Sequence, residues 1–90
     1  MEVLELDGPR GGAYYLVDLV DGRRMAISRK RSDNRVWLGR PDDPTSWSDQ
    51  RGGIGTISEL LERWRARVAL DPEAAELYQA LSALVSRKGA

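Results

Sequence analysis

The chain has 90 residues, of which 41% are hydrophobic and 31% are charged, and its 14 basic residues balance its 14 acidic residues. This size and composition are typical of one globular domain with a single core. The absence of cysteine and histidine excludes disulfides, the Ser-His and Cys-His nucleophile pairs and the usual zinc ligands, and the zero net charge argues against a dedicated duplex-DNA binder.

The charge is uneven along the chain. Residues 1–21 carry a net charge of −4, residues 22–51 carry +4, and residues 52–90 are balanced. No apolar run approaches the roughly 18 residues of a membrane span, and Met1-Glu2 leads into a strand-like segment in place of a leader. A cytoplasmic location without membrane contact is therefore expected.

The first 39 residues predict an antiparallel sheet. A short alternating segment at 3–6 predicts an edge strand. Asp21-Gly22 lies between two apolar runs of the segment 14–30, which predicts a hairpin with a two-residue type I′ turn that pairs Leu16 with Ile27. A further run at 35–39 predicts the fourth strand, after a turn-rich connection.

This register divides the sheet into two faces that are both largely apolar. The face predicted to lie under the helices holds Leu16, Val20, Met25, Ile27, Val36 and Leu38. The opposite face holds Tyr15, Val17, Leu19, Ala26 and Trp37. A sheet with one solvated side should alternate more regularly, so the second face is expected to bind something or to be covered.

Two helices are predicted after a long loop at 40–55, in which one helical turn beginning at Asp43 would pack Trp47 against the body of the protein. Thr56-Ile57-Ser58-Glu59 fits a capping box, and Asp71-Pro72 fits the start of a second helix after a short link. The first apolar stripe comprises Ile57, Leu60, Leu61, Trp64 and Val68. The second comprises Ala74, Leu77, Tyr78, Leu81, Leu84 and Val85.

The predicted fold is therefore α+β, a four-stranded antiparallel meander packed on one face by a C-terminal two-helix hairpin, in the order ββββαα. The whole chain, 1–90, is taken as a single α+β domain. It comprises the sheet at 2–39, the long loop at 40–55 and the helical hairpin at 56–88.

The second sheet face is the leading candidate for a functional site, because contiguous exposed apolar patches mark partner or self-association surfaces. The alternative is that the loops 7–12 and 40–55 fold over this face, with Trp47 as the cover. Anchoring to the body is favoured over partner binding as the role of Trp47. The predicted partner-binding residues are Tyr15, Val17, Leu19, Trp37, Arg24 and Arg35.

A second candidate is a single-stranded nucleic-acid site that uses the sheet aromatics beside the basic middle segment. Hairpin ends are commonly basic for solubility, and the total charge is zero, so this interpretation is the less favoured one. Its cationic residues would be Arg29, Lys30, Arg31 and Arg40.

Two further motifs favour structural interpretations. The glycines of 51–56 run into a helix N-terminus but lack the Lys-Ser/Thr ending of a P-loop, so a linker with a capping box is favoured over an anion site. Asp42, Asp43 and Asp49 suit turn chemistry better than an acid pair. No enzyme activity, cofactor or metal is expected.

The sequence thus predicts a non-enzymatic protein-interaction module, an adaptor or inhibitor that binds a larger partner through its exposed sheet face, with a homodimer as one form of that contact. Such a role would suit a protein encoded by a phage or a mobile element. The alternative is a small single-stranded nucleic-acid-binding protein.

Overall fold

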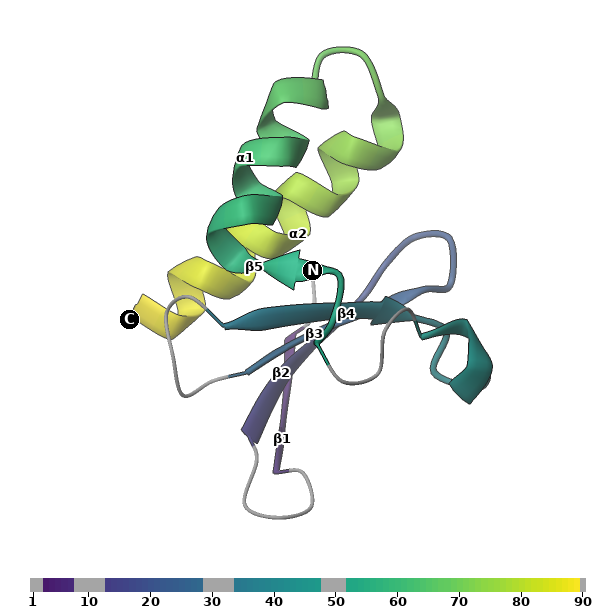
Figure 1. Cartoon of the computed structure of the whole chain (residues 1–90). Helices are drawn as coiled ribbons and strands as arrows, with labels where there is room; N and C mark the ends of the chain where they lie inside the picture. Colours follow the sequence, from purple (N-terminus) through teal and green to yellow (C-terminus); the bar gives the residue numbers. More distant parts are fainter. Residues whose placement is uncertain (1–2, 8–12, 29–33, 48–51, 90) are drawn as a thin grey trace.

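The computed structural model describes residues 3–7, 13–28, 34–47 and 52–89. The elements, shown in Figure 1, are β1 (Val3–Asp7), β2 (Ala13–Asp18), β3 (Arg24–Ser28), β4 (Arg35–Gly39), the 3-10 turn η2 (Pro44–Ser46), β5 (Gly55–Thr56), α1 (Ile57–Arg67) and α2 (Pro72–Gly89). The protein is α+β, an antiparallel sheet followed by two C-terminal helices, as the sequence predicts.

The sheet is a meander in which every strand pairs antiparallel with its neighbour in the chain, in the order β1-β2-β3-β4-β5. The two-residue strand β5 was not predicted, because so short a segment has no periodicity. Gly53 makes it possible: its φ is +72°, and a side chain here would collide with the backbone of Val36. The Ile54 amide donates to the Val36 carbonyl at 2.7 Å, which fixes the approach to β5.

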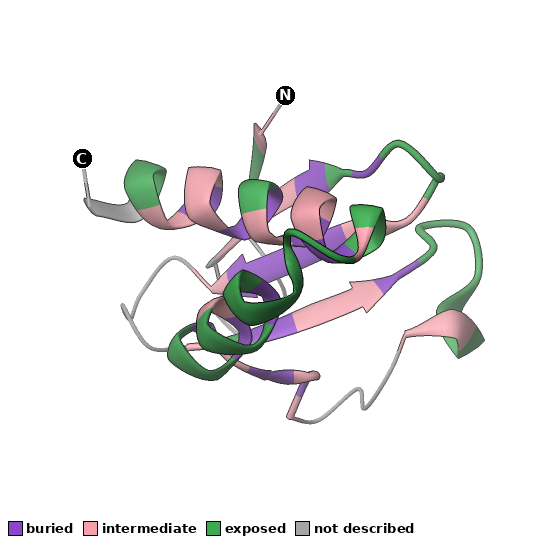
Figure 2. Cartoon of the chain, turned by 90° about the horizontal axis from the view of Figure 1, so that it is seen from above, coloured by how far each residue is buried: buried purple, intermediate pink, exposed green. Residues whose placement is uncertain are grey.

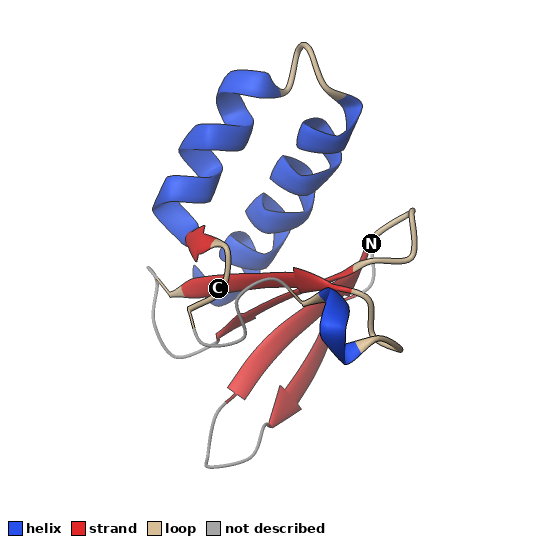
Figure 3. Cartoon of the chain, turned by 45° about the vertical axis from the view of Figure 1, so that its right-hand side comes forward, coloured by secondary structure: helices blue, strands red, loops and turns tan. Residues whose placement is uncertain are grey.

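Both helices pack on the same face of the sheet (Figure 3), and the core lies between them and the three central strands. Figure 2, seen from the helix side, shows the buried residues along β2, β3 and β4 and under both helices. The predicted helical stripes face the core: Leu61, Tyr78 and Val85 are partly buried against it and the other members are buried, apart from Val68, which follows the end of α1 and is 38% exposed. The core side chains are Val17, Leu19, Met25, Ile27, Val36, Ile57, Leu60, Trp64, Leu77, Ala80, Leu81 and Leu84.

The helix boundaries follow the predicted caps. The Glu59 amide donates to the Thr56 hydroxyl at 3.2 Å, and the Thr56 amide donates to the Glu59 carboxylate at 3.2 Å. At α2 the Glu73 amide donates to the Asp71 carboxylate at 3.0 Å, and Pro72 is the first helical residue. These bonds satisfy amides that have no partner within the helix. No helix in the described ranges has both the length and the apolarity needed to cross a membrane.

The predicted register of the β2–β3 hairpin is wrong by one residue. Leu16 pairs with Ala26 and Val17 with Met25, and the hairpin closes where the Leu19 amide donates to the Arg23 carbonyl at 2.8 Å. The loop therefore has three residues, ending on Gly22 with a φ of +90°, as expected for a turn followed by a glycine bulge. A one-residue shift moves every β2 side chain to the other face.

The β3–β4 register also differs from the prediction, but by two residues, so the faces are kept. Ile27 pairs with Val36 and Met25 with Leu38. Val36 is fully buried and Leu38 packs against the core, as predicted, and Trp37 lies on the opposite face beside Ala26. The connection is longer than the four residues assumed from the sequence.

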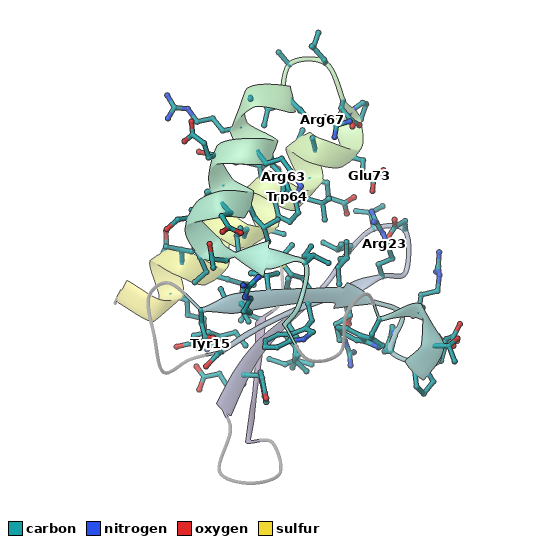
Figure 4. All side chains as sticks on the ribbon, viewed as in Figure 1. Tyr15, Arg23, Arg63, Trp64, Arg67 and Glu73 are labelled. Atoms are coloured by element: carbon teal, nitrogen blue, oxygen red, sulfur yellow. The ribbon has the colours of Figure 1, made fainter. Side chains whose placement is uncertain are left out.

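The long helix α2 is tied to the sheet at both of its ends. At its start Glu73 binds Arg23 at 2.9 Å and Glu76 accepts the Val20 amide at 2.6 Å; Figure 4 shows the Arg23 and Glu73 side chains facing each other. At its end Arg87 binds Glu5 of β1 at 2.8 Å and lies 5.8 Å from the centre of the Tyr15 ring. These contacts confirm that Tyr15 is on the helix-covered face.

Candidate functional site

The strongest candidate site is an apolar groove of about 390 Å³ on the sheet face opposite the helices. We call it the outer groove. Three aromatic side chains, two prolines and two aliphatic residues line it. They are Tyr14, Leu16, Ala26, Trp37, Pro41, Pro44 and Trp47.

The floor of the outer groove comes from three adjacent strands. Leu16 pairs with Ala26 and Ala26 with Trp37, so the three side chains form one row across β2, β3 and β4. Ala26 is the small member of the row, which leaves space above the sheet between its larger neighbours. Tyr14 meets Trp37 edge to face, with ring centres 5.9 Å apart, a geometry that aromatic pairs favour.

The segment 40–47 forms the wall at the far end of β4. Gly39 has no side chain, and an added Cβ would lie 2.5 Å from the Trp47 ring, so Trp47 packs directly on the strand backbone. Its indole N–H donates to the Arg40 carbonyl at 3.0 Å. This confirms the predicted helical turn and the anchoring of Trp47, which forms a side wall of the groove.

Several hydrogen bonds stabilise this wall. The Asp43 carboxylate caps η2 by accepting the Thr45 hydroxyl at 2.6 Å and the Thr45 amide at 3.0 Å. The Thr45 hydroxyl, followed by the backbone amide, also holds the pKa of Asp43 below its usual value. The Ser46 hydroxyl accepts the Arg40 amide at 2.7 Å and donates to the Asp43 carbonyl at 2.7 Å. Asp43 is thus a turn residue.

Charges around the groove are largely matched. Arg24 binds Asp18 through two contacts of 2.6 and 3.3 Å, and this hydrogen bond is the main reason that the pKa of Asp18 is lowered. Arg40 donates to the Asp21 carbonyl at 3.3 Å. Arg35 lies two residues before Trp37 on β4, on the same face, and its side chain binds no carboxylate among the described residues.

The structure separates the residues predicted for partner binding into two groups. Trp37 lines the outer groove, and Arg24 and Arg35 lie on the same face of the sheet. The prediction that the β2 members lie on the open face is wrong, because the three-residue hairpin loop turns Tyr15, Val17 and Leu19 under the helices. Val17 is 1% exposed and Leu19 6%, and Tyr15 packs against the core.

Tyr14 and Leu16 lie on the open face in place of Tyr15, Val17 and Leu19, but neither they nor the prolines of the wall were predicted as site residues. The register error alone assigned Tyr14 and Leu16 to the face under the helices. Gly22 with its positive φ fits a three-residue hairpin loop as well as a two-residue turn, so it allows the observed register without selecting it. Pro41 and Pro44 gave no signal beyond that of a loop.

The nucleic-acid alternative depends mainly on residues outside the described ranges, because Arg29, Lys30 and Arg31 fall within 29–33. The fourth predicted cation, Arg40, donates to a backbone carbonyl beside the wall of the groove.

The loops that were predicted as a possible cover for the sheet face are only partly described. Residues 40–47 and 52–55 belong to the described ranges, whereas 8–12 and 48–51 lie outside them. No group of three metal-binding side chains occurs within the described residues.

In the glycine-rich segment before α1, two of the described glycines allow the backbone to pack closely against its neighbours. A Cβ added at Gly53 would collide with the β4 backbone, and one added at Gly55, whose φ is +156°, would lie 3.3 Å from the Leu60 side chain. Chemically, the outer groove combines aromatic and aliphatic surface with a tyrosine hydroxyl and an indole N–H, which suits binding.

Comparisons of the chain with protein-family models, curated proteins and solved structures find no significant match.

Proposed function

We propose that this protein is a non-enzymatic protein-interaction module, a small adaptor or inhibitor that binds a larger partner protein through the outer groove. The observation that carries the proposal is the set of three aromatic side chains around a groove of about 390 Å³. Ligand and peptide sites are typically concave, mostly apolar and supplied with a few polar groups, and aromatic residues are enriched at the centres of interfaces.

The contacts that anchor Trp47 support this proposal. Trp47 is held by its own hydrogen bond, by η2 and by its packing on Gly39. A preformed site loses less side-chain freedom on binding than a flexible one, so more of the contact energy appears as affinity. We further propose that the protein acts in the cytoplasm, as expected from its sequence.

A nucleic-acid partner is less well supported. The open face and the segment 40–47 carry three arginines and three aspartates among the described residues, namely Arg24, Arg35, Arg40, Asp18, Asp42 and Asp43. Nucleic-acid affinity comes largely from unmatched cations that neutralise phosphates. A balanced rim around an apolar groove favours a protein ligand.

The test is selection of a phage-displayed random peptide library on the purified protein, followed by affinity measurement on wild type and two variants. Trp37→Ser should weaken the selected peptides at least about tenfold, as expected for an aromatic anchor. Leu70→Ser, which changes an 87% exposed side chain at the α1–α2 link, should leave the affinity unchanged. Thermal unfolding confirms that both variants are folded.

The proposal fails if no peptide is enriched, or if the enriched peptides bind both variants as tightly as wild type. Light scattering after size exclusion tests the homodimer form separately. A dimer that Trp37→Ser converts to a monomer would identify a second copy as the partner, whereas a monomer at high concentration leaves a different protein as the partner.

A further inference from the structure

Two polar groups on the aromatic side chains of the outer groove, the Tyr14 hydroxyl and the Trp37 indole N–H, can donate a hydrogen bond to a ligand. Among the described residues, neither the Tyr14 hydroxyl nor the Trp37 indole N–H donates a hydrogen bond, whereas the Trp47 indole N–H is already bonded to the Arg40 carbonyl. Burying an unpaired donor under a ligand costs free energy. The matching ligand therefore offers free acceptors to the groove and brings few donors of its own.

A proline-rich segment has this chemistry. Proline has no backbone N–H, and in the polyproline II conformation the carbonyls are free of internal hydrogen bonds. Its compact apolar rings pack well on aromatic side chains, and the segment is already extended before it binds, so that little conformational entropy is lost. Tyr14, Trp37 and Trp47 supply the aromatic surface, and Pro41 and Pro44 complete the wall.

The other secondary structures fit this groove less well. An amphipathic helix uses its carbonyls internally and would cover both donors with apolar side chains. An added β-strand needs the unpaired backbone of a sheet edge, but the outer groove lies on the face of the sheet and not along an edge. Both β2 and β3 are paired on both sides, and β4 is paired with β3 and, at Arg35 and Val36, with β5.

Charge adds one further requirement. Arg24 is matched by Asp18, but Arg35, beyond Trp37 on β4, binds no carboxylate among the described residues. A partner segment that crosses Trp37 towards Arg35 gains an ion pair if it carries an acidic residue beside its prolines.

We infer that the outer groove binds a proline-rich segment of a partner protein in the polyproline II conformation, with an acidic residue that pairs with Arg35. This inference rests on the proposed function and specifies the chemistry of the partner. It assigns separate tasks: the aromatic side chains hold the proline rings, the Tyr14 hydroxyl and Trp37 indole donate to carbonyls, and Arg35 selects the flanking charge.

The probe is a synthetic octaproline with two glutamates at each end, compared with the same peptide flanked by lysines and with a glycine-serine peptide flanked by glutamates. Amide and indole NMR spectra of the ¹⁵N-labelled protein report the site. The indole signals of Trp37 and Trp47 should shift with the glutamate-flanked octaproline, and the signal of Trp64, which is 6% exposed beneath the helices, should not.

Two variants, one conservative and one a charge reversal, separate the tasks. Tyr14→Phe removes one donor and keeps the ring, and should weaken the glutamate-flanked octaproline about two- to tenfold. Arg35→Glu should weaken the same peptide about two- to fivefold and reverse the preference in favour of the lysine-flanked peptide. Arg63→Glu, at an exposed position of α1, is the matched charge control and should change neither affinity.

The outcomes distinguish this inference from the proposed function. If octaproline peptides at millimolar concentration leave Trp37 and Trp47 unshifted, while phage-selected peptides shift them, the partner is not proline-rich and the interaction module stands. If neither class shifts these signals, both proposals fail. Two other results would also overturn the proline-rich partner. One is that a single-stranded oligonucleotide shifts these signals saturably and the peptides do not. The other is that the signals shift only when a dimer dissociates on dilution.

Discussion

Two valines of the same hairpin provide a sharp test of the sheet register. Val17 is 1% exposed and lies in the core, whereas Val20 is 95% exposed in the loop and uses only its amide, which donates to Glu76. Val17→Ala removes two buried methyl groups and leaves a small cavity, which should cost about 2 to 3 kcal/mol. Val20→Ala keeps the backbone bond and should change the stability by less than about 0.5 kcal/mol.

The measurement is urea unfolding followed by far-ultraviolet circular dichroism, with the free energy extrapolated to water at equal m-values. For a chain of 90 residues, a loss of this size should also lower the Tm by about 10 to 16 °C. A type I′ hairpin would place Val20 under the helices and Val17 outside, so it predicts the reverse order. Equal losses for the two variants, or a larger loss for Val20→Ala, would refute the three-residue loop and with it the composition of the outer groove.

Three further changes test other parts of the structure. Gly53→Ala should cost about 1 to 3 kcal/mol in the same urea assay, because its φ of +72° is strained for other residues and an added Cβ meets the β4 backbone; an unchanged midpoint would contradict this placement of the segment. Arg23→Ala and Glu73→Ala should show a coupling energy of about 0.5 to 1 kcal/mol in a double-mutant cycle, which additive effects would exclude. The Arg24 hydrogen bond lowers the pKa of Asp18 from its usual 3.8, so the ion pair contributes fully above that value and is lost as the pH falls through the lower folded-state pKa; Asp18→Asn should flatten this acid-side part of the Tm profile between about pH 5 and 2.

The helical half of the fold could be predicted from the sequence because its signals are local. The capping box at Thr56 and Glu59 and the Asp71 cap depend on residues within one turn of each other, and both apolar stripes repeat over two or more turns. Inward-facing Met25 and Ile27 were also predicted correctly, since in β3 the alternation with small or charged neighbours is clear.

The composition of the outer groove was only partly predictable. Along β2 apolar residues occupy both faces, so the hydrophobic pattern does not choose between Tyr14 with Leu16 and Tyr15 with Val17. The choice then falls to the loop length, and an Asp-Gly pair fits both the two-residue and the three-residue hairpin loop. Trp47 lies seven residues beyond Arg40, to whose carbonyl it binds, in a segment without periodicity, so no local rule could place its ring in the wall of the groove.

The attachment of α2 at both ends has a consequence for the kinetics of folding. The strands pair only with chain neighbours, but the Arg87–Glu5 and Val20–Glu76 contacts join residues 82 and 56 positions apart. Closing loops of this length costs more entropy than forming a hairpin, so we expect these contacts to form late in folding. Interactions formed after the folding transition state chiefly slow unfolding. The contacts at the two ends of α2 are therefore expected to lower the unfolding rate of the protein. A lower unfolding rate means that the sheet beneath is exposed to proteases less often.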